Sequence, residues 1–503
     1  MKPFGSITNT FSFIEEEDKE LVLRLVEESR NYDEFVEKLC DHVMSTDSSE
    51  IMVFLAYSHV RNTINYNAEK RFLDNFPEHP IIHLDNIKHQ MIDDDDWQSL
   101  LKEIDDAIAT NTNPLILFDL YCLKWIYIRS SSVGTLEEDK NIKEMTDLIQ
   151  RNQSLEPFRS HVFFFIASRY YVECDNEKAL QAYESAVQHA LTHDDVVFSS
   201  TLQSHIAHIL SRTDPTKALE IIESCAVKEK EFGCFNRYTG LLGVMGLIFD
   251  ARGEYNAAVR SFEETIERRQ KFNLKSREHL GPSAFSRSFR RMGYVKEALE
   301  WAKIAHTSKP RMSPRVQSIG VQVLANLCMS AALAMLGRIE EAKSYLDVGT
   351  EFVLKSGIET WMSDVYLCRG LIERAEGSLP EALENFENAL EINERLQRQS
   401  RMNECLFLLA ETEIQHYMES PDSEGIIALH RITTMEDMAR KKDLPGVLGL
   451  ALLLKARMLL FQGHNEEAQA ILNQVRELSN NPGTAFLKDK IEIVISENIP
   501  KKR

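Results

Sequence analysis

Apolar and small residues recur along this chain at helical spacing, as the stretch "GSLPEALENFENALEI" (377–392) illustrates. Ala382, Phe386 and Ala389 follow one another at steps of four and three residues. Residues at these steps lie on one face of an α-helix, so the three form a single stripe. The pattern predicts a helix that begins after Gly377 and packs along this stripe.

The same group of residues occurs 124 positions earlier, where the counterparts of Gly370, Gly377, Ala382, Phe386 and Ala389 are Gly246, Gly253, Ala258, Phe262 and Thr265. Further copies centre on Ala179, Ala218, Ala298, Ala342 and Ala468. The alanines from 179 to 382 are separated by 39, 40, 40, 44 and 40 residues, and the last gap, of 86, holds one degenerate unit around Ile426. A regular step of this kind indicates a repeat array.

Each unit reads as two antiparallel helices joined by a tight turn. A small residue in the first helix and the alanine in the second lie where the helices cross, because only small side chains let the backbones approach closely. A glycine five residues before the alanine follows the first helix, where a left-handed capping residue is favoured. These glycines are Gly253, Gly293, Gly337, Gly377 and Gly463.

This pattern resembles the tetratricopeptide repeat (TPR), whose first helix carries a small residue and whose second carries Ala, Phe and Ala, followed by Pro. Gly370, Ala382, Phe386 and Ala389 match it, and Ala298, Ala302, Ala305 and Pro310 match it in another unit. The step of about 40 residues resembles a longer-helix variant of the family. The resemblance implies an all-α, right-handed α-solenoid and says little about activity.

We expect three parts along the chain. Residues 1–155 are interpreted as degenerate helical repeats that form an N-terminal cap, with a separate helical domain as the alternative. Residues 156–481 form the TPR-like array, and residues 482–503 form a C-terminal capping helix and tail. Helices in the first part are predicted by apolar periodicity at Lys19–Glu28, Ile51–Arg61, Asp95–Thr110 and Leu115–Ile128.

Composition narrows the function classes. The 503 residues carry a net charge of −20, which disfavours a nucleic acid as partner because a polyanion would be repelled. The eight cysteines form no CxxC pair, and the most apolar run, from Leu444, is broken by Lys455 and Arg457. We therefore expect a cytoplasmic protein that does not enter a membrane.

No sequence motif indicates catalysis, a cofactor or a metal. A phosphate loop, an HExxH helix and a GxSxG turn are all missing, so we expect a non-enzyme without a cofactor. His189 and His193, and likewise His205 and His208, could share a helix face, but neither pair has an obvious third metal ligand. The run Asp93–Asp96 is better read as acidic residues that complement the N-terminus of the following helix.

One segment departs from the acidic balance. Between Arg268 and Arg315 the chain has thirteen Lys or Arg and three Glu, a net of +10 that leaves −30 for the rest. In TPR proteins the first helices line a concave groove, and the positions one and four beyond the small residue face it. The resemblance therefore implies a partner-binding groove lined by Arg287, Arg290, Arg291, Leu247, Leu371, Arg374 and Gly243.

Two interpretations of this surface stay open. An arginine fork binds carboxylates, so the groove could receive an acidic protein segment; alternatively, the arginines pair with the chain's own Asp and Glu. Gly240 and Gly243 lie with Gly246 on one stripe, either for close helix packing or as a shallow groove floor. The function predicted is a scaffold or adaptor that binds a protein or peptide. The alternative is a ligand-sensing regulator that acts through a partner chain.

Overall fold

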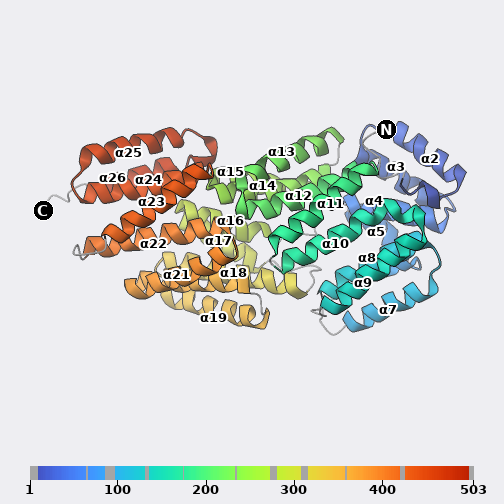
Figure 1. Ribbon diagram of the computed structural model, residues 1–503, viewed down its shortest axis with the longest axis horizontal. Coiled ribbons are helices and arrows are strands. Elements are labelled where there is room, and N and C mark those ends of the chain that lie inside the picture. Colours follow the sequence, from blue (N-terminus) through green and yellow to red (C-terminus); the bar gives the residue numbers. More distant parts are fainter. Residues whose placement is uncertain are drawn as a thin grey trace.

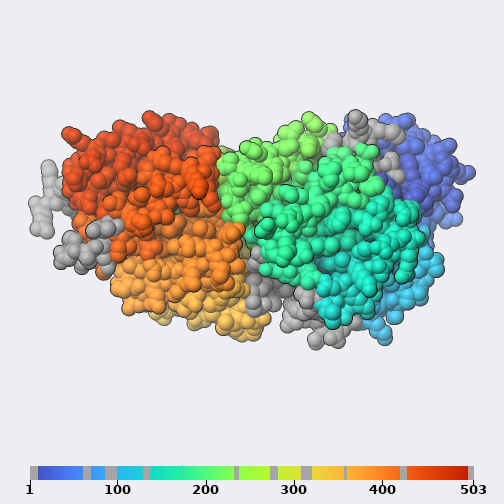
Figure 2. Space-filling view, in the orientation of Figure 1, coloured from blue at the N-terminus to red at the C-terminus, as the bar shows by residue number. Residues whose placement is uncertain are grey.

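The computed structural model describes residues 9–63, 66–84, 97–130, 135–173, 175–232, 235–271, 280–307, 315–356, 359–419 and 425–497. Every regular element in these residues is a helix and none is a strand, which confirms the all-α prediction. The molecule is elongated, with the N-terminal helices at one end and the C-terminal helices at the other (Figure 1, Figure 2).

The N-terminal third is a set of short helices around one hydrophobic core. Its helices are α2 (Glu16–Glu27), α3 (Tyr32–Ser45), α4 (Glu50–Thr63), α5 (Tyr66–Asn75), α7 (Trp97–Thr110), α8 (Pro114–Ser130) and α9 (Thr135–Arg151), with 3-10 turns η2 (Phe11–Phe13) and η4 (Gln153–Phe158). The four helices predicted in this part are confirmed. Their core runs from Ile14 to Phe165, so it also includes the start of the next helix.

The middle and C-terminal parts consist of longer helices that alternate in direction. They are α10 (Arg159–Val172), α11 (Asn176–Thr192), α12 (Val196–Thr213), α13 (Pro215–Phe232), α14 (Phe235–Arg252), α15 (Tyr255–Lys271), α16 (Leu280–Met292), α17 (Val295–Thr307), α18 (Arg315–Met335), α19 (Ile339–Ser356), α20 (Met362–Glu376), α21 (Leu379–Arg395), α22 (Gln399–Glu419), α23 (Gly425–Lys441), α24 (Pro445–Phe461), α25 (Asn465–Leu478) and α26 (Leu487–Glu497), with 3-10 turns η5 (Glu359–Trp361) and η6 (Pro482–Thr484).

These helices form an α-solenoid of antiparallel pairs. Each helix from α10 to α25 packs on the next, and contacts between helices two apart link α12, α14, α16, α18 and α20 in series and join α22 to α24. The even-numbered helices therefore make an inner layer in two stretches, α12 to α20 and α22 to α24, and the odd-numbered helices cover it from outside. This arrangement confirms the predicted TPR-like architecture.

Packing within the repeat follows the predicted register. A Cβ added to Gly246 would come within 2.3 Å of the Phe262 ring, and one added to Gly370 within 2.6 Å of the Phe386 ring. The backbones of α14 and α20 thus lie directly against the aromatic side chains of α15 and α21. The five predicted capping glycines all have a positive φ, from 72° at Gly337 to 92° at Gly293, so each ends a first helix in the left-handed conformation.

The solenoid bends so far that its C-terminal part returns to its middle. Helices α12 and α14 contact α22, and α14 also contacts α24. A Cβ on Gly446 would lie 1.9 Å from the carbonyl oxygen of Gly253, so the two backbones touch. One hydrophobic core joins residues from Tyr255 to Met292 with residues from Met435 to Val494. This core contains much of apolar α24, and no helix among the described residues has the length and apolar character needed to cross a membrane.

Candidate partner-binding site

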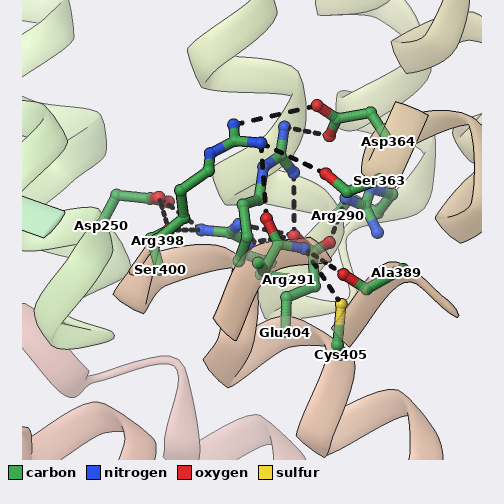
Figure 3. A network of polar contacts seen from close by, with 12 residues as sticks. Asp250, Arg290, Arg291, Ser363, Asp364, Ala389, Arg398, Ser400, Glu404 and Cys405 are labelled. Atoms are coloured by element: carbon green, nitrogen blue, oxygen red, sulfur yellow. Dashed lines mark hydrogen bonds and ion pairs between the residues drawn. The ribbon is translucent and has the colours of Figure 1, made fainter. Parts of the chain in front are cut away.

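The bend brings charged residues from several inner helices together in the interior. We call this group the inner charge network (Figure 3); its members are Asp250 of α14, Arg290 and Arg291 of α16, Asp364 of α20, and Arg401 and Glu404 of α22. All six are buried. The carboxylates of Asp250, Asp364 and Glu404 lie on different sides of the guanidinium groups (Figure 3).

Glu404 is the centre of the network. Its carboxylate accepts hydrogen bonds from Arg290, from Arg291 Nε at 3.1 Å and from Arg401 Nη1 at 3.0 Å. Burial alone would raise the pKa of Glu404, but the charges of these three arginines hold it well below its usual value. Glu404 therefore stays ionised in the folded protein.

The two other carboxylates complete the network. Asp250 accepts from Arg291 and, at 2.9 Å, from Ser400 Oγ. Asp364 forms an ion pair with Arg401. Three arginines thus meet three carboxylates, so the inner charge network is electrically balanced.

Helix α22 lies on the concave side of the other inner helices. Ser400, Glu404 and Glu411 share one face of α22, and they contact α14, α16 and α20 respectively. The last contact is an ion pair in which Arg374 Nη1 lies 2.6 Å from Glu411 Oε2. The predicted groove helices α14, α16 and α20 are thus in contact with another helix of the same chain.

The seven predicted groove residues lie in different surroundings, and five of them already contact other parts of the chain. Arg290 and Arg291 belong to the inner charge network, and Arg374 is paired with Glu411. These three arginines thus pair with the chain's own Asp and Glu. Leu371 is buried in the core between α18 and α22, and Leu247 is half-buried against the core shared by α15 and α24. These five side chains are already held by the fold.

Gly243 keeps an open neighbourhood. A Cβ added to Gly243, or to Gly240 one turn earlier, would meet no atom within 4 Å. Gly246 on the same stripe is the closely packed one. The stripe therefore combines both interpretations: tight packing at Gly246 and open space above the two preceding glycines.

Arg287 is the remaining predicted residue, and it differs from its neighbours on α16. Its side chain is half-buried and has no hydrogen-bond or ion-pair partner among the described residues. Burial lowers the pKa of Arg287, and the charge of Arg401 lowers it further. The charge of Asp250 opposes this effect, but no carboxylate among the described residues is bonded to Arg287.

Sequence reasoning did not find the acidic partners of these arginines. Glu404 lies 113 residues beyond Arg291, and no local spacing connects the two. The available signal is in α22 itself, where Asn403 and Glu404 directly precede the apolar run Cys405–Ala410, Glu413 follows it, and all three are buried with it. A helix that is apolar around its whole circumference is expected in a core, and polar residues within it need internal partners.

The histidine pairs lie against other side chains. His189 approaches Glu156 at 3.5 Å, and His205 stacks on Tyr183. Helix α11 ends at Thr192, so Asp195 does not continue it and instead caps α12. Within the described ranges no group of three or more His, Cys, Asp or Glu side chains is placed to hold a metal ion. The run 93–96 lies outside the described residues.

Comparisons with known proteins find similarity in structure only. No family model and no curated protein matches the sequence. Among solved structures, a Rap protein complexed with competence and sporulation factor is 13% identical with a TM-score of 0.41, covering 68% of this chain and 98% of its own. The Cut9–Hcn1 hetero-tetramer of the APC/C is 14% identical with a TM-score of 0.43, covering 85% and 76%.

A third solved structure is a STAND signal-transduction ATPase with a tetratricopeptide repeat sensor from Pyrococcus horikoshii. It is 13% identical with a TM-score of 0.33, covering 88% of this chain and 74% of its own. Scores this low carry no argument about function. The likeness to tetratricopeptide repeats rests instead on this chain's own packing, in which Gly246 meets Phe262 and Gly370 meets Phe386.

Proposed function

We propose that this protein is a non-catalytic scaffold that binds an acidic segment of a partner protein on its inner face, around Arg287. The observation that carries the proposal is the half-buried guanidinium of Arg287, which has no hydrogen bond or ion pair among the described residues. Its neighbours on α16, Arg290 and Arg291, are neutralised internally. A partner carboxylate would supply the counter-charge that the fold leaves out.

The open surface at Gly240 and Gly243 offers space for the backbone of a partner segment in the same region. Gly240 and Gly243 leave the face of α14 open, and α14 contacts α16, which carries Arg287. An extended segment along α14 could place an acidic side chain toward α16. Arg287 makes no ion pair among the described residues, so its replacement should cost the fold little stability. A desolvated charge contact in an interface contributes about 2–5 kcal/mol to binding.

The alternative function, sensing of a small ligand or signalling peptide, has one observation in its favour. The bend of the solenoid is closed by polar contacts between distant segments, such as Arg252 Nη2 to Asp443 Oδ2 at 3.3 Å across 191 residues. A ligand that altered these contacts would change the curvature. Thermal-shift measurements with metabolite pools would favour this alternative if they found a stabilising small molecule.

Selection from a displayed library of random peptides tests the scaffold proposal. We expect the wild-type protein to enrich peptides rich in Asp and Glu, and Arg287→Glu to lose this enrichment while keeping its helical circular-dichroism signal. Arg369→Glu is the matched control, because Arg369 is an exposed arginine of α20 outside the inner charge network. Enrichment of peptides without acidic residues, or equal selection by Arg287→Glu, would contradict the proposal.

A further inference from the structure

Charge counting identifies a second group of arginines beside the inner charge network. The network balances three arginines with three carboxylates, so any further arginine at this place carries excess charge. Arg287 is one such residue. Two more, Arg398 and Arg212, lie where the bend brings α12 against α22. We call Arg212, Arg287 and Arg398 the arginine cluster.

Arg398, directly before α22, is held mainly by neutral oxygen atoms. Its Nη1 donates to the Thr360 carbonyl oxygen at 2.7 Å and to Ser363 Oγ at 3.2 Å. The carboxylate of Asp364, which already pairs with Arg401, is 4.0 Å from Arg398 Nη2. These contacts fix the position of the guanidinium group and neutralise its charge only weakly.

The end of α12 that carries Arg212 and the start of α22 beside Arg398 lie together, because Lys442 Nζ bonds both the carbonyl oxygen of Thr213 and the side chain of Gln399. Arg287 lies one turn before Arg290 and Arg291, which bind Glu404 on the same helix α22. Burial is the largest cause that lowers the pKa of Arg398, to about 10, and the charges of Arg401, Arg212 and Arg287 lower it further against the opposing effect of Asp364. Burial itself disfavours the cation, and a carboxylate in direct contact would oppose that effect. Asp364 and Asp250 act on the cluster electrostatically, but within the described residues no carboxylate accepts a hydrogen bond from it, so its positive charge is only weakly compensated.

Arg212, at the end of α12, also has no carboxylate partner in the part of the chain that the structure describes. Its Nη2 donates to the hydroxyl of Tyr171, and its guanidinium lies 4.8 Å from the centre of that ring. Lys442 adds a fourth cation nearby, since its Nζ donates to the carbonyl oxygen of Thr213 at 3.3 Å and to the side chain of Gln399. Both cations are positioned by neutral groups.

We propose that Arg212, Arg287 and Arg398 form a binding site for one oxyanion, either a carboxylate or a phosphate group. The side chains come from three separate elements, are partly exposed and, for Arg212 and Arg398, are already oriented by hydrogen bonds. Planar guanidinium groups bind the oxygen pairs of carboxylate and phosphate with charge-assisted hydrogen bonds. The inference rests on the proposed function only for the source of the anion, which is the acidic partner segment.

Thermal melting of the purified full chain tests the site with defined probes. Inorganic phosphate at low millimolar concentration is compared with chloride at matched ionic strength, and a hexaglutamate peptide is compared with hexaglutamine. The variants are Arg287→Met, which keeps the apolar stem of the side chain, Arg287→Lys, and the control Arg369→Met on α20.

We expect phosphate and hexaglutamate to raise the melting temperature of the wild type, and hexaglutamine to have no effect. Arg287→Met should bind both anions about tenfold more weakly or worse, because a hydrogen bond to a charged group is lost. Without anion its melting temperature should equal or exceed that of the wild type, since a repelled cation has been removed. Arg287→Lys should retain part of the response, and Arg369→Met all of it.

The outcomes separate the anion site from its source and from the scaffold function. A response to phosphate but not to hexaglutamate would support the site and overturn the peptide as its source. Equal responses in wild type and Arg287→Met, or no response to either anion, would overturn the site. Peptide selection that failed while the anion response held would count against the scaffold function alone.

Discussion

Glu404→Gln is expected to lower the free energy of unfolding by about 3–5 kcal/mol, the usual cost of removing one partner from a buried ion pair. The substitution keeps the shape of the side chain but leaves Arg290, Arg291 and Arg401 without their shared carboxylate. Chemical denaturation followed by circular dichroism measures the loss. Glu384→Gln is the control, because Glu384 is exposed on α21 and should change stability by less than about 0.5 kcal/mol.

The Glu404 carboxylate should also make the stability of the protein depend on pH. The pKa of Glu404 in the folded protein lies well below its usual value, so the folded state binds fewer protons there than the unfolded state. The stability that Glu404 contributes is therefore present above the unfolded pKa of about 4.3 and is lost as pH falls toward the folded value. As pH falls below the unfolded pKa, the wild type should therefore lose stability more steeply than Glu404→Gln. Parallel curves of stability against pH for the two proteins would contradict the assigned role of Glu404.

Gly246→Ala is expected to destabilise the protein by about 1–3 kcal/mol, whereas the identical change at Gly240 should stabilise it by up to about 1 kcal/mol. Both glycines lie on α14, where alanine is the better helix former. At Gly246 the added Cβ would lie 2.3 Å from the buried Phe262 ring, and at Gly240 it meets nothing within 4 Å. Packing therefore outweighs helix propensity only at Gly246.

Denaturation midpoints of the two variants, measured side by side, check this prediction. Because the substitution, the helix and the gain in helix propensity are the same, their difference reports packing alone. If Gly246→Ala were as stable as Gly240→Ala, the helix crossing of the repeat would not lie at Gly246. Gly370→Ala should behave like Gly246→Ala, since its Cβ would meet the Phe386 ring at 2.6 Å.

The repeat architecture was predictable because its determinants are local. Each capping glycine stands at a fixed distance from the alanine of its helix pair, and the small residue at Gly246 or Gly370 lies sixteen positions before its aromatic partner, Phe262 or Phe386. Such short separations leave a pattern that repeats along the chain. Four helices of the N-terminal third, α2, α4, α7 and α8, were likewise indicated by their apolar periodicity.

The state of the groove was not predictable in the same way. Whether α22 fills the concave side depends on the accumulated bend of several helix pairs, and the resulting contacts join residues as far apart as Asp250 and Ser400, 150 positions away. A contact between residues so far apart leaves no repeated spacing in the sequence from which it could be predicted. The basic segment was correctly singled out for its charge, but which of its arginines are neutralised, as Arg291 is, and which are not, as Arg287 is, depends on these distant partners.

A structure of the protein bound to an acidic peptide obtained by library selection tests the central claim most directly. The account predicts a peptide carboxylate within hydrogen-bond distance of Arg287, with the peptide backbone near Gly240 and Gly243 and the Arg290–Glu404 ion pair intact. A peptide bound on the outer, odd-numbered helices, or one that displaced Glu404 from its arginines while leaving Arg287 free, would contradict it.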